Sequence, residues 1–184
     1  MEERNLISYD EAVKIGIREG IKYIKDQEFY KTKKRYDRRL RNTRLLLKNY
    51  RTLLIHNKLA DDTVNQVKGE NAVDILDDIE SINDEEQYVQ ALSRTKIRTV
   101  TILGHINKAI KYYKYICEAE DSLKERRYKI ISYMYLEPSE NEVNRTYEQV
   151  AEHFNLSIKT VGRDVRLAVE DLSILFFGID GIKL

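Results

Sequence analysis

Apolar residues recur at helical spacing through the first third of the chain. One set lies on a single helical face: Val13, Ile17, Ile21 and Ile24. Ser8 and Glu11 form an S-x-x-E capping box at the start of this set, and a second apolar set follows over 40–54 without an intervening Pro. We therefore predict helix over 8–57, as one long helix or as two helices that meet near Glu28–Thr32.

The same periodicity continues in the second half. Apolar positions from Val89 to Ile116 predict a long helix from about Asp84 to Glu118, preceded by a loop-rich stretch with a short helix around Ala72–Ile79. Asp121 or Ser122 can cap a further helix, which Glu137-Pro138 should end near Leu136. The predicted fold class is all-α, with long N-terminal helices and a C-terminal helix-turn-helix domain.

Composition agrees with long, solvated helices. The 184 residues include only 7 Gly and 1 Pro, and 34% are charged, which argues against a sandwich or a barrel. A single Cys excludes an internal disulfide framework, and no apolar run approaches the length of a membrane-spanning helix. We expect a cytoplasmic protein with no membrane partner, divided into a basic helical segment (1–57), an acidic connector (58–84), a long helix (85–120) and the helix-turn-helix domain (121–184).

A compact helix-turn-helix pattern occupies residues 146 to 172. Thr146 and Gln149 form a T-x-x-Q capping box before a short helix that ends at Phe154. Asn155 tolerates the left-handed backbone of a tight turn, and Ser157 can cap the next helix. The inner positions of that helix are apolar: Val161, Val165, Ala168, Val169 and Leu172. The layout predicts a recognition helix over Ile158–Leu172.

The outward side chains of this predicted recognition helix suit DNA. They are Ser157, Lys159, Thr160, Arg163 and Arg166. Hydroxyl, ammonium and guanidinium groups are the usual donors to base edges and phosphates. An ordinary helical hairpin with solvated charges is the alternative interpretation.

These residues also carry a family resemblance. The run from Thr146 to Val161 resembles the T-x-x-E/Q-I-A-x-x-L-x-x-S-x-x-T-V pattern of sigma factor region four. The resemblance to region four covers about residues 122–177. The wider layout resembles phage late-gene transcription regulators of the ArpU and RinA kind. The resemblance implies activation of late phage operons, with double-stranded DNA and RNA polymerase as partners. No stretch resembles the promoter-opening region two of a sigma factor, which favours an accessory activator.

Charge is distributed in two opposing blocks. Residues 31–51 contain ten basic residues and one acid, whereas 61–86 contain ten acids and one Lys. The basic block predicts a second DNA contact through Lys33, Lys34, Arg35, Arg38, Arg39 and Arg41. Alternatively, it pairs with the acidic block within the same fold. Its Leu residues also predict packing, either within the chain or in a homodimer.

Nothing in the sequence predicts catalysis. The three His residues stand apart, Cys117 has no evident activating base, and phosphate-binding or nucleophile motifs are absent. We expect no enzymatic activity, no cofactor and no metal. The alternatives to a transcription regulator are a DNA-packaging protein like a phage small terminase subunit and a helical protein-binding adaptor.

Overall fold

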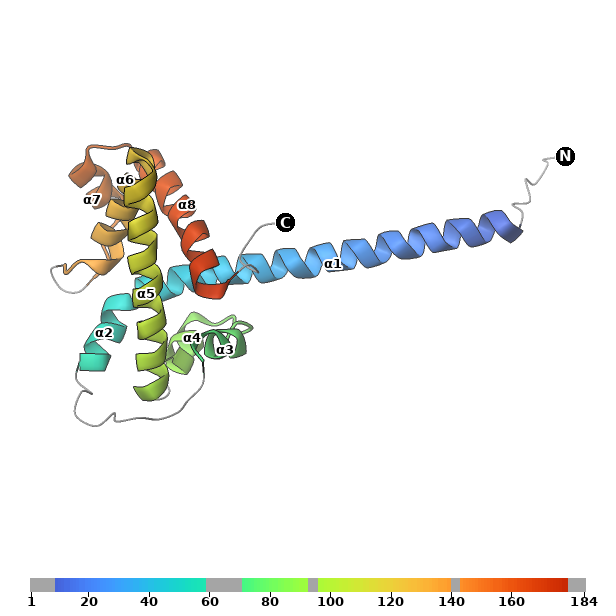
Figure 1. Ribbon diagram of the computed structural model, residues 1–184, viewed down its shortest axis with the longest axis horizontal. Helices are drawn as coiled ribbons and strands as arrows, with labels where there is room; N and C mark the ends of the chain where they lie inside the picture. The colour runs from blue at the N-terminus through green and yellow to red at the C-terminus, as the bar shows by residue number, and fades with distance from the viewer. Residues whose placement is uncertain (1–8, 59–70, 93–95, 140–142, 179–184) are drawn as a thin grey trace.

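The computed structural model describes residues 9–58, 71–92, 96–139 and 143–178. These residues form eight α-helices and one π-helical turn, and they contain no strand. The all-α prediction is therefore confirmed. A compact helical body carries the chain's first helix as a long projection (Figure 1).

The N-terminal region consists of α1 (Tyr9–Lys48) and α2 (Tyr50–Lys58). The two helices meet at Asn49, far from the expected position near Glu28–Thr32. The Asn49 side chain donates to the Leu45 carbonyl oxygen at 2.8 Å, and the Asn49 amide donates to the same oxygen at 3.0 Å. The first half of α1 leaves the body, whereas its second half crosses the other helices (Figure 1).

The middle of the chain is more divided than predicted. It forms α3 (Ala72–Asp78), α4 (Glu85–Leu92) and α5 (Lys96–Glu120), so the single helix expected over 84–118 is two helices. Tyr88 and Leu92 are fully buried, and α4 packs beside one end of α5 (Figure 1). Thr99 donates its hydroxyl to the Leu92 carbonyl oxygen at 3.3 Å. Burial of the apolar side of α4 against α5 therefore outweighs continuation of one helix.

The acidic region also belongs partly to the folded body. Asn71 caps α3 by accepting from the Val73 amide, and Ile75 and Leu76 of α3 are buried in the core. The short helix predicted at Ala72–Ile79 is thus present. Residues 59–70, with the acids Asp61, Asp62 and Glu70, lie outside the described part of the chain.

The C-terminal third contains α6 (Ser122–Ile131), the π-helical turn η1 (Ser132–Leu136), α7 (Tyr147–Phe154) and α8 (Ile158–Phe177). Asp121 caps α6 by accepting from the Lys124 amide at 2.7 Å, and the helical run ends before Pro138, as predicted. The core forms where α5, α6 and α8 pack together and α1 crosses them. Leu45, Leu46 and Leu47 of α1 are buried in that core, so this apolar set packs within its own chain.

Candidate nucleic-acid interface

The first helix of the predicted motif begins at Thr146. The Gln149 amide donates to Thr146 Oγ1 at 3.3 Å, and the Thr146 amide donates to Gln149 Oε1 at 2.8 Å. Both halves of the capping box are therefore formed, and two otherwise unpaired amides of the first turn are satisfied. Val150 and Ala151 are buried, which anchors this side of α7 against α8.

The turn between α7 and α8 has the geometry that the sequence predicts. Asn155 has φ 51° and ψ 50°, in the left-handed region, and its amide closes the end of α7. Ser157 Oγ then accepts from the Thr160 amide at 3.1 Å and caps α8. The short connection holds the two helices in a fixed relative orientation.

The recognition helix has one buried side and one exposed side. Every predicted inner residue is buried: Val161, Val165, Ala168, Val169 and Leu172. The helix continues five residues beyond its predicted end, and Phe176 and Phe177 are also buried in the core. On the other side, Ser157, Lys159, Arg163 and Arg166 are exposed and Thr160 is half-buried. The five predicted DNA-contacting residues therefore lie on one outer surface of a well-anchored helix.

Local contacts order these outer side chains. The Ser157 and Thr160 hydroxyl oxygens are 2.9 Å apart and share a hydrogen bond. Arg163 Nε lies 3.6 Å from Asp164 Oδ1, and Arg166 donates to Glu170 Oε1 at 2.7 Å. The guanidinium groups remain 59% and 55% exposed as side chains, so surface pairs of this kind do not block binding to phosphate.

A buried ion pair holds the recognition helix against α6. Arg126 donates to Asp164 Oδ2 through Nε at 2.8 Å, and its Nη2 lies 2.7 Å from the same oxygen. The Asp164 side chain is only 1% exposed. Sequence reasoning missed this pair, although Asp164 lies three residues after buried Val161 and four before buried Ala168. An acid at that inner position signals a buried cationic partner.

A second support for the motif is a three-membered stack on α7. The Tyr133 and His153 rings lie parallel, with centroids 3.8 Å apart and an interplanar angle of 11°. The Arg145 guanidinium lies over the Tyr133 ring at 4.0 Å and donates to the Pro138 carbonyl oxygen at 2.6 Å. The stack joins Arg145, just before α7, to both η1 and α7, and no spacing in the sequence indicated it.

The six N-terminal candidates divide into two groups. Lys33 and Lys34 are exposed on the projecting part of α1. Arg35 and Arg38 each lie 3.6 Å from a carboxylate oxygen of Glu80. Arg39 is 1% exposed and Arg41 donates to the Asn83 carbonyl oxygen at 3.1 Å and to that of Ile82.

Arg39 is thus an interior residue. It donates to the Phe177 carbonyl oxygen at 3.2 Å and to Asp77 Oδ1 at 3.3 Å. Its guanidinium carbon lies 5.4 Å from the centre of the Phe177 ring. A side chain enclosed in this way is not available to phosphate, which is a correction to its predicted role. Glu80 and Asp77 belong to the acidic block, so the block pairs with Arg35, Arg38 and Arg39 inside the fold.

The exposed lysines of α1 start close to the recognition helix. Burial, followed by the nearby carboxylates of Glu170 and Asp37, raises the pKa of the Tyr36 phenol, whereas Arg166 opposes this shift. The pKa of Tyr36 therefore depends on charges on the outer side of α8. An open groove near this junction is lined by Tyr30, Lys33, Lys34, Asp37, Arg38 and Arg41. All six lining residues belong to α1, which packs against α8.

Other chemistry is sparse in the described part of the chain. Cys117 is buried, and burial raises the pKa of its thiol, which disfavours the thiolate nucleophile. His105 hydrogen-bonds to the Phe176 carbonyl oxygen at 2.9 Å through Nε2. Among the described residues, no group of His, Cys, Asp and Glu has the arrangement of a metal site. None of the helices described is long and apolar enough to cross a membrane.

Comparison with known proteins leaves the motif to be judged by its own geometry. No protein family matches the chain, and no curated protein or solved structure matches it either.

Proposed function

We propose that the protein is a sequence-specific DNA-binding transcriptional regulator, which reads DNA with α8. The observation that carries the proposal is the arrangement of α7, the Asn155 turn and α8. Two capped helices are joined by a left-handed turn, and the outer side of the second bears Lys159, Arg163 and Arg166. This arrangement is typical of helices that enter the major groove.

In the proposed complex, the N-terminal end of α8 enters the groove first. Ser157, Lys159 and Thr160 then lie nearest the base edges, and Arg163 and Arg166 read guanine or bind phosphate. The buried pair of Arg126 and Asp164 keeps the angle of α8 constant while its outer side binds. Preorganisation of this kind lowers the cost of binding.

Lys33 and Lys34 would extend the contact along the DNA backbone. They precede Tyr36 by three and two residues, and the charges of Arg166 and Glu170 of α8 act on the pKa of Tyr36. Lysine contacts of this kind contribute affinity without sequence preference, and salt weakens them. Arg39 has no part in this contact because it is enclosed between α1, α3 and α8.

The biological setting rests on the resemblance to phage late-gene regulators. We infer that the targets are late genes of a phage or prophage and that the protein assists RNA polymerase rather than replacing its sigma factor. The resemblance to sigma factor region four is limited to the C-terminal part of the chain.

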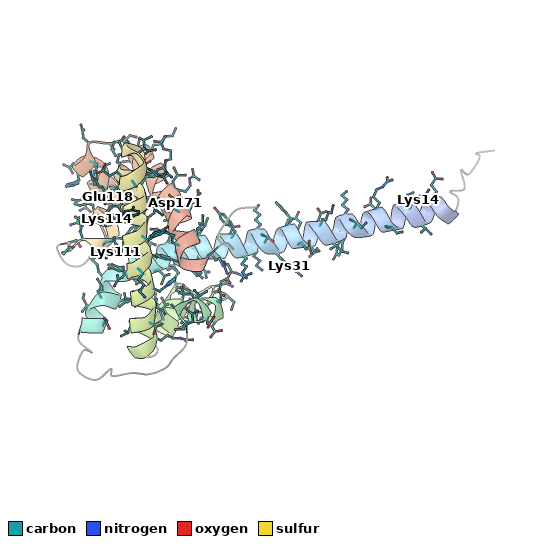
Figure 2. The ribbon with its side chains drawn as sticks, in the orientation of Figure 1. Lys14, Lys31, Lys111, Lys114, Glu118 and Asp171 are labelled. Atoms are coloured by element: carbon teal, nitrogen blue, oxygen red, sulfur yellow. The ribbon has the colours of Figure 1, made fainter. Side chains whose placement is uncertain are left out.

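Binding titrations on a selected duplex and a scrambled duplex test the proposal. Arg163→Ala should weaken binding by about 1–3 kcal/mol and relax preference at one base pair if Arg163 reads guanine. Lys33→Ala should weaken both duplexes equally and lower the salt slope by about one. Lys111→Ala is the matched control because it removes an exposed charge from α5. Tyr113 of α5 contacts Asp171 of α8, and Lys111 lies two residues away, on the far side of α5 (Figure 2).

Wild-type affinity of Arg163→Ala and Arg166→Ala on both duplexes would refute a DNA-reading role for α8. Binding that shows no salt dependence would favour a protein-binding adaptor instead. A ring of many subunits that binds DNA without sequence preference would favour a packaging protein.

A further inference from the structure

The projecting half of α1 is an exposed helix with no covering element in the described structure. Every side chain described between Glu11 and Arg35 is exposed, and the segment extends away from the body, with Lys14 near its tip (Figure 2). An isolated helix of this length is only marginally stable in water, and helices in proteins are stabilised mainly by packing of an apolar face. The segment from 9 to 34, called the arm below, is about 39 Å long.

The arm has a seam in which large side chains alternate with small ones, and Gln27 is its polar member. Residues spaced alternately by three and four form it: Val13, Gly16, Gly20, Tyr23, Gln27 and Tyr30. Ile17 and Ile24 lie along one edge of this seam. Charged side chains occupy the opposite side of the helix, at Lys14, Arg18 and Lys25. The two glycines leave open space, because a Cβ at either position would meet no atom within 4 Å.

We propose that the arm is a dimerisation surface, which packs antiparallel against the arm of a second copy of this chain. This proposal does not depend on DNA binding. When two antiparallel arms overlap fully, residue 9 of one copy lies level with residue 34 of the other. Any residue i of one copy is then level with residue 43 minus i of the other. Tyr23 then lies over Gly20, Tyr30 over Val13 and Gln27 over Gly16. Large residues therefore face small ones along the whole seam.

The same register matches the charges at the ends of the arm. It brings Glu11 of one copy level with Thr32 of the other, which lies between Lys31 and Lys33. A parallel pair would instead align the two basic stretches that begin at Lys31, and like charges at such distances repel. A second copy in antiparallel orientation thus accounts for the size pattern and keeps the two basic stretches apart.

The available apolar area is sufficient for a specific dimer. Val13, Ile17, Tyr23, Ile24 and Tyr30 are between 42% and 66% exposed. At roughly 100 Å² each, they offer about 500 Å² per copy and about 1,000 Å² per pair. This area reaches the range of specific interfaces even without the surface around the glycines. Two-fold symmetry makes the contact self-limiting.

Sedimentation equilibrium of the full chain tests the dimer. We expect a mass twice the 21.8 kDa of one chain at micromolar concentration. Ile17→Lys combined with Ile24→Lys should raise the dimer dissociation constant at least about 100-fold, because it places like charges beside the seam. Ile15→Lys is the matched control, because Ile15 is 44% exposed but lies on the charged side of the arm. The dissociation constant of the Ile15→Lys dimer should therefore equal that of the wild type.

Two further measurements test the orientation. In a Cys117→Ala background, spin labels at Thr32→Cys should be offset by about 32 Å along the helix axis in an antiparallel dimer, whereas a parallel dimer gives almost no offset. Glu19 and Asp26 face each other across the edge of the antiparallel seam, so Glu19→Lys should tighten the dimer several-fold.

A monomer at all concentrations would overturn the proposal, as would a dimer that Ile15→Lys disrupts as strongly as the double variant. A short offset at residue 32 would overturn the antiparallel orientation. Binding of the monomer to vesicles of anionic phospholipid, lost in the double variant, would assign the seam to a membrane surface instead.

Discussion

The buried pair of Arg126 and Asp164 should respond unequally to removal of its two members. Asp164 is 1% exposed, whereas Arg126 is 27% exposed as a side chain. Arg126→Ala leaves a carboxylate buried without its main partner. Asp164→Ala leaves a guanidinium group that water can still reach. We therefore expect Arg126→Ala to be the more destabilising substitution.

The magnitudes follow from the burial of each group. Loss of the partner of a fully buried charge costs about 3–5 kcal/mol. Because Arg163 Nε lies 3.6 Å from Asp164 and remains as a second cation, the cost of Arg126→Ala should be about 3 kcal/mol. Loss of the hydrogen bonds to a partly exposed Arg should cost about 1–2 kcal/mol for Asp164→Ala. The double variant should be less destabilised than the sum of the two.

Urea unfolding at neutral pH, followed by circular dichroism, measures these free energies of unfolding. Lys129→Ala is a matched control on α6, because its ammonium group pairs with Glu125 at 2.6 Å at the surface and its loss should cost less than about 0.5 kcal/mol. A cost below about 1 kcal/mol for Arg126→Ala, or a larger cost for Asp164→Ala than for Arg126→Ala, would refute this account of how α8 is anchored.

Three other substitutions probe separate features by thermal or chemical unfolding. Asn155→Ala should cost about 1 kcal/mol because its φ of 51° is left-handed, whereas Asn155→Gly should be tolerated; equal melting temperatures for Asn155→Ala and wild type would contradict this. Gly104→Ala should stabilise by about 0.5–1 kcal/mol, since a Cβ there meets no atom within 4 Å and Gly lowers helix stability; a loss of stability would show a close contact. Burial raises the pKa of Tyr135 from 10.0 to about 12, so the contribution of Tyr135 to the free energy of unfolding should be constant below pH 10 and fall between pH 10 and 12. Urea titrations at pH 8 and pH 11 measure the difference in free energy of unfolding between the two pH values. Tyr135→Phe should reduce this difference, and an equal difference in the variant and the wild type would contradict the prediction.

Local signals in the sequence predicted the helix-turn-helix well. The Thr146 and Gln149 capping box, the left-handed Asn155 and the Ser157 cap are each decided within four residues of chain. Their hydrogen bonds are therefore readable from spacing alone. The apolar face of α8 was predictable for the same reason, because helical periodicity is a local property.

Features that depend on distant partners could not be predicted in the same way. Nothing near Lys96 indicates that α4 and α5 separate, because the separation depends on burial of Tyr88 and Leu92 by other elements. The basic block illustrates the same limit, since its charges alone do not distinguish exposed Lys33 from buried Arg39. Which cations face water depends on the position of Glu80, about forty residues later.

The contact between Arg39 and the Phe177 carbonyl oxygen also constrains the order in which the protein can fold. The two residues are 138 positions apart, and α1 and α8 are among the most extensively packed pairs of helices. During synthesis α1 leaves the ribosome before α8, and the part of its surface that packs against α8 stays uncovered until α8 has been made. A chain truncated before α8 would leave Arg39 of α1 without the Phe177 carbonyl oxygen and ring that it contacts. Synthesis of α8 is therefore the step that allows the body to close, and contacts of such long sequence separation slow folding.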